Sequence, residues 1–254
     1  MKKYLFFDFD GTLTTGGGRG IIPEDTIECI NLLKYKGHIV CLATGRLQRD
    51  TVRVAAPLNI EHIIADGGYS YTEKNKVIFM RPLNMQNARA LLKELDEKRI
   101  PWAVNDRNEM SILAQESAKG KLIFHKQFEI RYENDIIIDD IDNIYKIHIA
   151  VEKDRLDEIN FRGFQYLLYY ENGVMIEPME KDEGIMEFAA LKNAEDKDII
   201  VFGDGYNDLK MFHENWYCVA MGNAIDKLKE KADFVTKKSF EGGIMYACKT
   251  LGLI

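Results

Sequence analysis

Carboxylates follow two short apolar runs that have the composition of buried strands. Asp8 and Asp10 come directly after Tyr4–Phe7, and Asp204 and Asp208 come just after Ile199–Phe202. Ligand sites in open α/β sheets lie beyond the carboxyl ends of the strands. Four carboxylates gathered there would repel one another strongly unless a cation lay among them. Oxygen ligands alone favour Mg²⁺, which often shares an oxygen of a bound phosphate. The spacing therefore predicts a magnesium site that handles phosphate.

Two plainer interpretations of these aspartates compete with a magnesium site. A calcium loop of the EF-hand type needs Gly at its sixth position and Glu at its twelfth. Counted from Asp8, those positions are Leu13 and Arg19, so this interpretation fails. Turn-capping aspartates would account for one such motif alone. Two motifs at strand ends, together with the elements below, favour chemistry.

Two further segments could hold an anion. Thr44 and Gly45 follow the apolar run Ile39–Ala43 and precede a predicted helix, and a hydroxyl, a glycine and a helix N-terminus together form an anion seat. The alternative is that Thr44 is only a helix cap. Lys181 lies just before a helix expected to begin near Ile185. Taken alone, a lysine is usually a solvated surface residue.

The order of predicted elements divides the chain. Strands and helices alternate over residues 1–82 and 179–254, which is typical of a parallel sheet with helices on its faces. Residues 83–178 are predicted as hairpins and a helix, an α+β module inserted into that discontinuous α/β domain. We expect Gly68–Arg81 to be a hairpin that leaves the sheet, and Asp208–His213 to be a helix. Tyr145–Val151 alternates like a strand with one covered face.

Composition limits the function classes. The 254 residues are 46% hydrophobic and 30% charged, which is typical of a globular chain. The net charge of −7 argues against nucleic acid and anionic membranes as partners. No apolar run is long enough to span a membrane. The four cysteines form no CxxC pair and are predicted to be buried thiols, so we expect a reducing compartment, the cytoplasm.

The motifs resemble those of the haloacid dehalogenase superfamily. Four elements carry the resemblance, in this order along the chain: DFDGT at 8–12, Thr44 in ATGR, Lys181, and GDGYND at 203–208. The insertion resembles a C2-type cap, and the last motif is similar to that of the Cof-like hydrolases with a C2B cap. Asp66-Gly67-Gly68 departs from the Asn-Gly-Ala that the family often has at this turn. The resemblance implies a Rossmann-like core and a cap that selects the substrate.

The resemblance also implies roles for individual residues. Asp8 would be the nucleophile that forms an aspartyl-phosphate. Asp10 would protonate the leaving alcohol and then accept a proton from water. Mg²⁺ would be held by the carboxylates of Asp8 and Asp204 and by the backbone carbonyl of Asp10. Asn207 and Asp208 would orient metal-bound waters and the phosphate. The groups expected to contact the phosphate are Gly11, Thr44, Gly45, Lys181 and Asn207.

The function so implied is a Mg²⁺-dependent phosphatase of small phosphorylated metabolites, with sugar phosphates as the leading class. One alternative is a phosphotransferase or phosphomutase on the same scaffold. Another is a phosphate-responsive binding protein without activity. The presence of Asp10 argues against that last alternative, because a protein that only binds phosphate needs no acid–base group.

Overall fold

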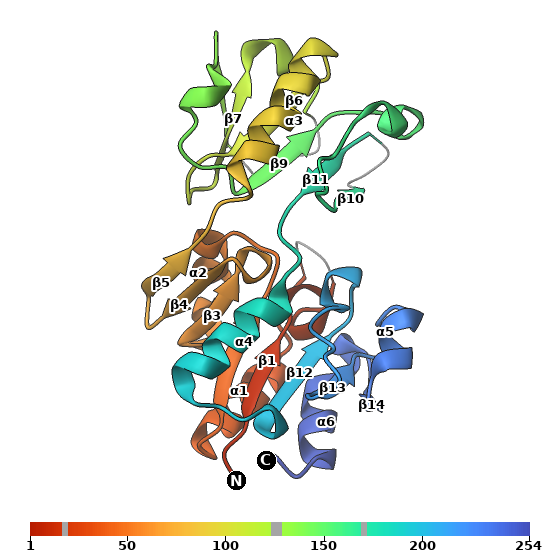
Figure 1. Cartoon of the computed structure of the whole chain (residues 1–254). Helices are drawn as coiled ribbons and strands as arrows, with labels where there is room; N and C mark the ends of the chain where they lie inside the picture. The colour runs from red at the N-terminus through yellow and green to blue at the C-terminus, as the bar shows by residue number, and fades with distance from the viewer. Residues whose placement is uncertain (17–19, 123–128, 169–171) are drawn as a thin grey trace. The chain divides into compact units, whose positions relative to one another are not determined.

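The computed structural model describes residues 1–16, 20–122, 129–168 and 172–254. The chain forms two compact units. Residues Met1–Met80 together with Met179–Ile254 make up the first, called the core unit here, and Arg81–Pro178 make up the second, the inserted unit. The two units are coloured by sequence in Figure 1.

The core unit is built on one eight-stranded sheet in the order β14-β13-β12-β1-β2-β3-β4-β5. Its strands are β1 (Tyr4–Phe7), β2 (Ile39–Ala43), β3 (His62–Ala65), β4 (Ser70–Glu73), β5 (Lys76–Met80), β12 (Ile199–Gly203), β13 (Tyr217–Ala220) and β14 (Phe234–Val235). Its helices are α1 (Glu24–Tyr35), α2 (Gln48–Ala55), α4 (Lys181–Lys192), α5 (Asp226–Lys231) and α6 (Gly243–Thr250). The strands from β14 to β3 run parallel, which confirms the expected α/β fold class.

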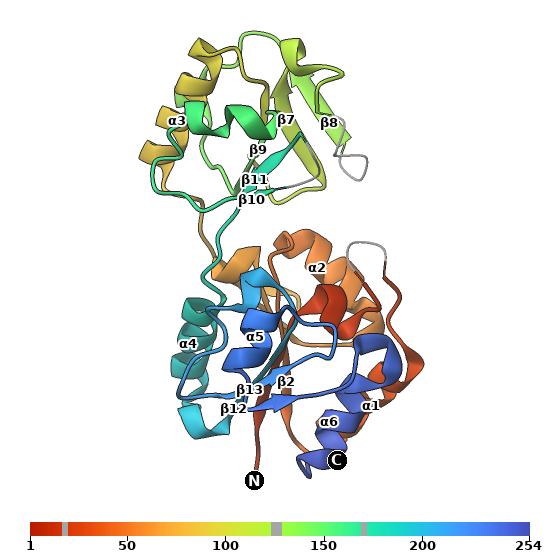
Figure 2. The same cartoon turned by 90° about the vertical axis from the view of Figure 1, so that its right-hand side faces the viewer.

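Strand β1 shows why both faces of this sheet are covered. Leu5 and Phe7 belong to an apolar cluster shared with α1, α2 and α6, whereas Tyr4 and Phe6 belong to a cluster shared with α4 and α5. Alternate side chains of a strand point to opposite faces, so an uninterrupted apolar run is what a strand between two helical layers requires. Figure 2 shows α4 and α5 on one side of the sheet and α1 and α6 on the other.

The hairpin β4–β5 corrects one expectation, because it stays in the sheet. β4 pairs antiparallel with β3, and β5 pairs antiparallel with β4. Tyr71 of β4 is buried, and its ring packs edge-on against Phe188 of α4 at 5.5 Å between centroids. That aromatic contact holds the hairpin against the same helical layer as the parallel strands.

Two helix expectations in the core unit were also wrong. Asp208–His213 is not an α-helix: a single 3₁₀ turn covers Tyr206–Asp208, and turns follow it. The carboxylate of Asp208 accepts hydrogen bonds from the backbone N–H groups of Asp204 and Gly205, so it stabilises a loop rather than a helix. Helix α4 begins at Lys181, four residues before Ile185, which makes that lysine its first residue.

The inserted unit has a six-stranded sheet in the order β10-β11-β9-β6-β7-β8. The bounds are α3 (Met85–Glu97), β6 (Trp102–Asn105), β7 (Ser111–Gln115), β8 (Glu129–Glu133), β9 (Lys146–Ile149), β10 (Leu167–Leu168) and β11 (Val174–Ile176). Helix α3 packs its leucines on one face, together with Trp102 and Ile147. β9 differs from the expectation of one covered face, because all four of its residues are buried. Lys146 and His148 on its other face are buried with polar partners.

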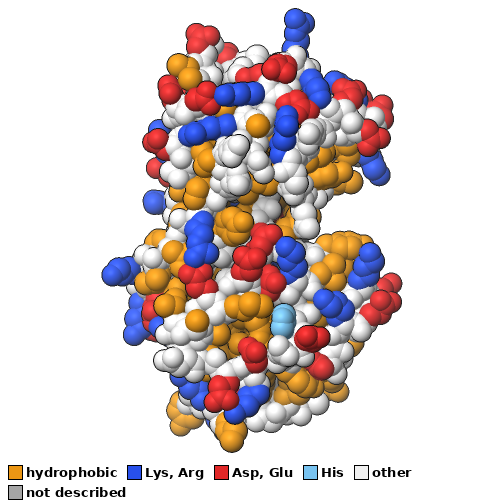
Figure 3. Space-filling model, viewed as in Figure 1, with side chains coloured by type: hydrophobic (Ala, Val, Ile, Leu, Met, Phe, Trp, Pro, Cys, Tyr) orange, Lys and Arg blue, Asp and Glu red, His pale blue; other side chains and the backbone are white. Residues whose placement is uncertain are grey.

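Charged side chains of both signs are interspersed over the surface shown in Figure 3. In the described parts of the chain, no helix is both long and apolar enough to cross a membrane.

Candidate active site

Two neighbouring strands place Asp8 and Asp204 at one edge of the core sheet. β1 and β12 pair in parallel with Phe7 opposite Phe202, and the backbone N–H of Asp8 donates to the Phe202 carbonyl at 2.9 Å. Asp8 therefore leaves β1 level with the end of β12, where Asp204 follows. The side chain of Asp8 is buried, and that of Asp204 is half-buried. The predicted meeting of the two motifs at this edge is what the structure shows.

Lys181 is the cation at the centre of this group. Its side chain is wholly buried, and Nζ donates to Asp8 Oδ1 and to Asp208 Oδ1, each at 2.6 Å. Burial alone lowers the pKa of Lys181, but the charges of Asp208 and Asp8 and the hydrogen bonds to them outweigh burial and raise it. The lysine is therefore charged. Lys192, at the other end of α4, pairs instead with Glu73.

Among the described residues, the group carries more negative than positive charge. Asp8, Asp204 and Asp208 each offer a carboxylate oxygen, and the three atoms lie within 4.8 Å of one another. Burial raises the pKa of Asp8 well above its usual value; the charge of Lys181 opposes this, and the charges of Asp208 and Asp204 add to it. Burial, followed by the charge of Asp208, raises the pKa of Asp204 to about 6. Burial and the repulsion between neighbouring carboxylates thus both disfavour the ionised forms of these two groups.

The donor set fits a magnesium ion. Both oxygens of Asp208 are engaged, one by Lys181 and the other by two backbone N–H groups. Within the described residues, hydrogen bonds reach only the Oδ1 atom of Asp8, so its second oxygen is available to a cation. With Asp204, this gives two carboxylates on a group with excess negative charge, and oxygen-only donors suit Mg²⁺.

The loop after β1 lies against Asp204. Thr12 Oγ1 donates to Asp204 Oδ1 at 2.9 Å. Gly11 has a φ of +86°, and a Cβ on it would lie 2.2 Å from Asp204 Oδ2. Only glycine allows this approach, so the role of Gly11 shown by the structure is to admit the carboxylate.

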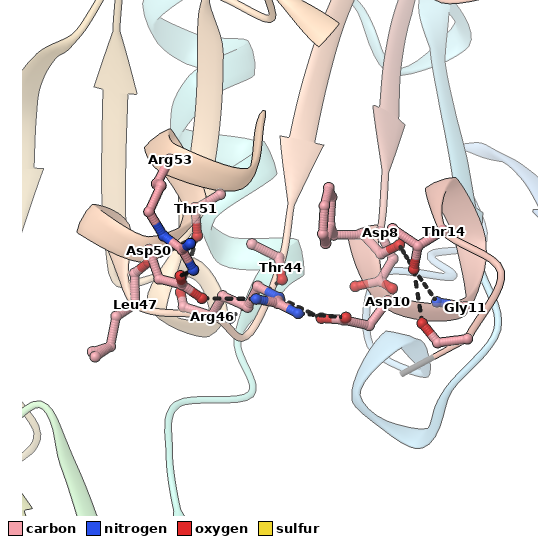
Figure 4. Close-up of polar contacts among 12 residues, drawn as sticks. Asp8, Asp10, Gly11, Thr14, Thr44, Arg46, Leu47, Asp50, Thr51 and Arg53 are labelled. Carbon is pink, nitrogen blue, oxygen red and sulfur yellow. Dashed lines mark hydrogen bonds and ion pairs between the residues drawn. The ribbon is translucent and has the colours of Figure 1, made fainter. Parts of the chain in front are cut away.

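The side chain of Asp10 is not part of the acidic group, which corrects the expectation that all four carboxylates gather there. Both of its carboxylate oxygens accept hydrogen bonds from Arg46, from Nε at 2.6 Å and from Nη2 at 2.7 Å. The third nitrogen, Nη1, donates to Asp50 Oδ2 at 2.7 Å, and Asp50 pairs in turn with Arg53. Figure 4 shows this chain running from the β1 loop to helix α2. Since its side chain faces Arg46, only the backbone carbonyl of Asp10 remains as the expected metal ligand.

The Thr44 segment is fixed by backbone contacts. Thr44 is buried; its hydroxyl accepts from the N–H of Arg46 at 3.2 Å, and its carbonyl accepts from the N–H of Gly67 at 3.0 Å. Gly45 follows it in the same loop. Asn207 lies in the 3₁₀ turn after Gly205 and is half-buried. The structure places these residues at the ends of β2 and β12, and their contact with a phosphate stays a prediction.

The departure at Asp66-Gly67-Gly68 has a structural role. Asp66 Oδ2 accepts from the Gln48 N–H and from the Ser70 hydroxyl, and the Gly67 carbonyl accepts from the N–H of Glu180 at 2.8 Å. A Cβ on Gly68 would lie 2.0 Å from the Glu180 carbonyl oxygen. This turn thus ties the start of α4, and with it Lys181, to the end of β3.

Sequence reasoning gave no role to two residues of this site. Arg46 is part of the ATGR motif, and nothing in the spacing indicates that it reaches Asp10. Asn223 lies outside the four motifs. It follows β13, and the rule that sites gather at carboxyl ends of parallel strands could have found it.

Comparisons with known proteins agree with this geometry. The family model of the haloacid dehalogenase-like hydrolases matches residues 5–248. The chain belongs to this family. With this match, the expected family and the expected enzyme type, a phosphatase of the haloacid dehalogenase superfamily, are both confirmed.

Several relatives span the whole chain. Bacillus subtilis YkrA, whose name assigns it provisionally to the phosphatases, is 31% identical over 100% of this chain and 99% of its own length. B. subtilis YwtE, a 5-amino-6-(5-phospho-D-ribitylamino)uracil phosphatase, is 28% identical over 96% of each chain.

Two solved structures are similar over their full lengths. A protein from Geobacillus kaustophilus has a TM-score of 0.88 at 28% identity, with 100% of both chains covered. The subclass IIB sugar phosphatase BT4131 has a TM-score of 0.79 at 24% identity, also with 100% of both chains covered, and it shows the likeness of the fold.

Proposed function

We propose that this hydrolase is a Mg²⁺-dependent phosphatase that cleaves small phosphorylated metabolites through a phosphoenzyme on Asp8. The observation that carries the proposal is the buried Lys181 ammonium between Asp8 and Asp208, with Asp204 beside them. A nucleophilic carboxylate next to a fixed cation and an unbalanced acidic group is suited to receive a phosphoryl group. Bound Mg²⁺ would supply charge stabilisation of the phosphoryl oxygens.

The chain's own residues account for both halves of the reaction. An oxygen of Asp8 attacks phosphorus while the bond from phosphorus to the ester oxygen breaks, and Asp10, once protonated and separated from Arg46, gives the leaving alkoxide a proton. Water then attacks the phosphoryl group and gives a proton to Asp10, which restores Asp8 and releases inorganic phosphate. Lys181 and Thr44 hold phosphoryl oxygens as charge develops. Asp208 holds Lys181, and Asn207 lies in the same turn.

The residues proposed to hold Mg²⁺ are the carboxylates of Asp8 and Asp204 and the backbone carbonyl of Asp10. Two observations support this set: the side chain of Asp208 is fully engaged, and that of Asp10 is held by Arg46. The phosphate is proposed to contact Gly11, Gly45 and Asn207 in addition to Thr44 and Lys181.

Sugar phosphates are the proposed substrate class. The relative YwtE acts on a phosphorylated ribityl compound, which supports a polyhydroxylated leaving group. Residues 1–82 and 179–254 are proposed as the catalytic core, and residues 83–178 as a C2-type cap that selects the substrate. Four buried free thiols support the cytoplasm as the compartment.

The test is phosphate release from a panel of sugar phosphates, nucleotides and phosphorylated acids. We expect release with Mg²⁺, none after EDTA treatment, and poor replacement by Ca²⁺, because Ca²⁺ prefers more ligands at longer distances. Full activity without metal would refute the metal site. Transfer of the phosphoryl group to a second sugar instead of water would favour a phosphotransferase, and phosphate binding without turnover would favour a binding protein.

A further inference from the structure

Asn223 connects the two loops that carry the proposed metal ligands. Its side-chain Nδ2 donates to the Gly11 carbonyl at 2.9 Å and to Asp204 Oδ2 at 3.2 Å. Gly11 belongs to the loop after β1, and Asp204 follows β12. One amide thus spans two segments that lie 193 positions apart in the chain (204 − 11).

The same amide is itself held in place. Asn223 Oδ1 accepts a hydrogen bond from the backbone N–H of Ser239 at 2.9 Å. Because the acceptor end of the amide is used in this way, the NH₂ end must face Gly11 and Asp204. The residue is exposed, so its three hydrogen bonds are not needed to satisfy a buried amide.

Both carboxylate oxygens of Asp204 therefore accept a hydrogen bond from a neighbouring side chain. Thr12 donates to Oδ1 and Asn223 to Oδ2, while Gly11 allows the close approach of the loop. Each oxygen keeps a second lone pair, so a carboxylate fixed in this way can still bind a cation. Groups that hydrogen-bond a metal ligand orient it, and their loss typically weakens metal binding about 10–100-fold.

We infer that Asn223 is a positioning residue that orients Asp204 toward the β1 loop for binding of a divalent cation. The inference rests on the proposed function, because it takes Asp204 as a ligand of Mg²⁺. It assigns no chemical step to Asn223. Its effect is on the affinity for the cation and not on the reacting atoms.

The chain offers a matched control on the same strand. Asn215 lies before β13 and Asn223 lies after it, so the two asparagines flank opposite ends of one strand. Both are exposed, and only Asn223 contacts the acidic group. Asn223→Ala and Asn215→Ala therefore make the same chemical change with and without loss of the contact to Asp204.

Mn²⁺ is the probe, and its free concentration is followed by electron paramagnetic resonance in titrations of the full chain. We expect Asn215→Ala to bind like wild type and Asn223→Ala to bind about tenfold more weakly. Thr12→Val removes the donor to the other oxygen and should also weaken binding. The double variant Asn223→Ala with Thr12→Val should lose less than the product of the two effects, because both act on one carboxylate.

A second readout separates positioning from general damage to the fold. If Asn223 positions a metal ligand, saturating Mg²⁺ restores kcat of Asn223→Ala to within a few-fold of wild type, and only the Mg²⁺ half-saturation rises. Thermal melting in EDTA shows whether the variant folds; if Asn223→Ala does not, Asn223→Ser is titrated in its place.

The outcomes point to different failures. Absence of Mn²⁺ binding in the wild type would refute the proposed metal site itself. Binding by the wild type and by Asn223→Ala with equal affinity would overturn the inference and leave the proposed function standing. Equal weakening in Asn215→Ala would also overturn it, because the effect would then belong to the strand and not to the contact.

Discussion

The two units each bury a lysine, and the surroundings of the two lysines differ. In the inserted unit, Lys146 of β9 pairs with Glu177, and their side chains are 6% and 5% exposed. In the core unit, Lys181 is 0% exposed and meets two carboxylates, with a third nearby. Among the described residues, the first group pairs one charge of each sign. The described part of the second group holds more carboxylates than cations.

The polar residues near the two lysines also differ between the units. Beside the pair in the inserted unit, His148 Nε2 and Asn105 Oδ1 lie 2.7 Å apart, again both buried. In the core unit, buried or half-buried acids have raised pKa values. Balanced buried charge is compatible with a purely structural role, whereas unbalanced buried charge costs stability unless a ligand completes it. A balanced buried group is therefore typical of the framework, and an unbalanced one is typical of a ligand site.

The largest expected effect is on the nucleophile. Asp8→Asn is close in shape, but its amide cannot attack phosphorus, so turnover should fall by at least about 10⁴-fold. Lys181 would keep Asp208 as a partner, and the fold should survive. The measurement is kcat with a sugar phosphate at saturating Mg²⁺, with circular dichroism as the control for folding. A kcat near that of wild type would remove Asp8 from the mechanism.

The second-largest effect is expected from substitution of Lys181. Lys181→Met should lower kcat about 10²–10³-fold, since one preorganised donor to the phosphoryl oxygens is lost. It should also lower the melting temperature in EDTA, because Asp8 and Asp208 then face each other without a cation. Added Mg²⁺ should raise that temperature more in this variant than in wild type. No difference between the two Mg²⁺ effects would contradict the idea that the group is short of positive charge.

The core sheet and the acidic residues at its edge could largely be predicted from the sequence, for a physical reason. A parallel strand buried on both faces has a continuous apolar run, and its carboxyl end is where polar side chains collect, so Asp8 and Asp204 could be placed together. The pairing of Asp10 with Arg46 could not, because side-chain contacts between segments 36 residues apart leave no periodic trace. The hairpin β4–β5 was misplaced because its attachment to the sheet depends on the packing of Tyr71 against Phe188 in a distant segment.

A smaller effect is expected from substitutions in the Lys146–Glu177 pair, and it should be confined to the stability of the fold. Glu177→Gln removes the carboxylate that pairs with the buried ammonium of Lys146 and should lower the free energy of unfolding by about 3 kcal/mol. The double variant Lys146→Met with Glu177→Leu removes both charges and should recover most of that loss. Urea unfolding measures both variants. Mn²⁺ binding should be unchanged in each, and weaker binding would show that the two lysine groups are not independent.

The smallest effect is a dependence of cation binding on pH. The pKa of Asp204 is raised to about 6, above its usual 3.8, first by burial and then by the charge of Asp208. Without metal, the folded protein therefore carries an unfavourable charge at pH 7. Protonation relieves this as the pH falls through about 6, so this group adds stability to the metal-free protein toward pH 4 and removes it as the pH rises. A cation needs the ionised carboxylate, so its affinity changes in the opposite direction and should fall about tenfold per pH unit below that pKa. The raised pKa of Asp8 acts in the same sense.

The gain in melting temperature on adding Mg²⁺ should therefore shrink from pH 7.5 to pH 5, and Asp204→Asn should show little gain at any pH. A gain that stayed constant over this range in wild type would mean that neither carboxylate is protonated there, and that the core group is as well balanced as the pair in the inserted unit.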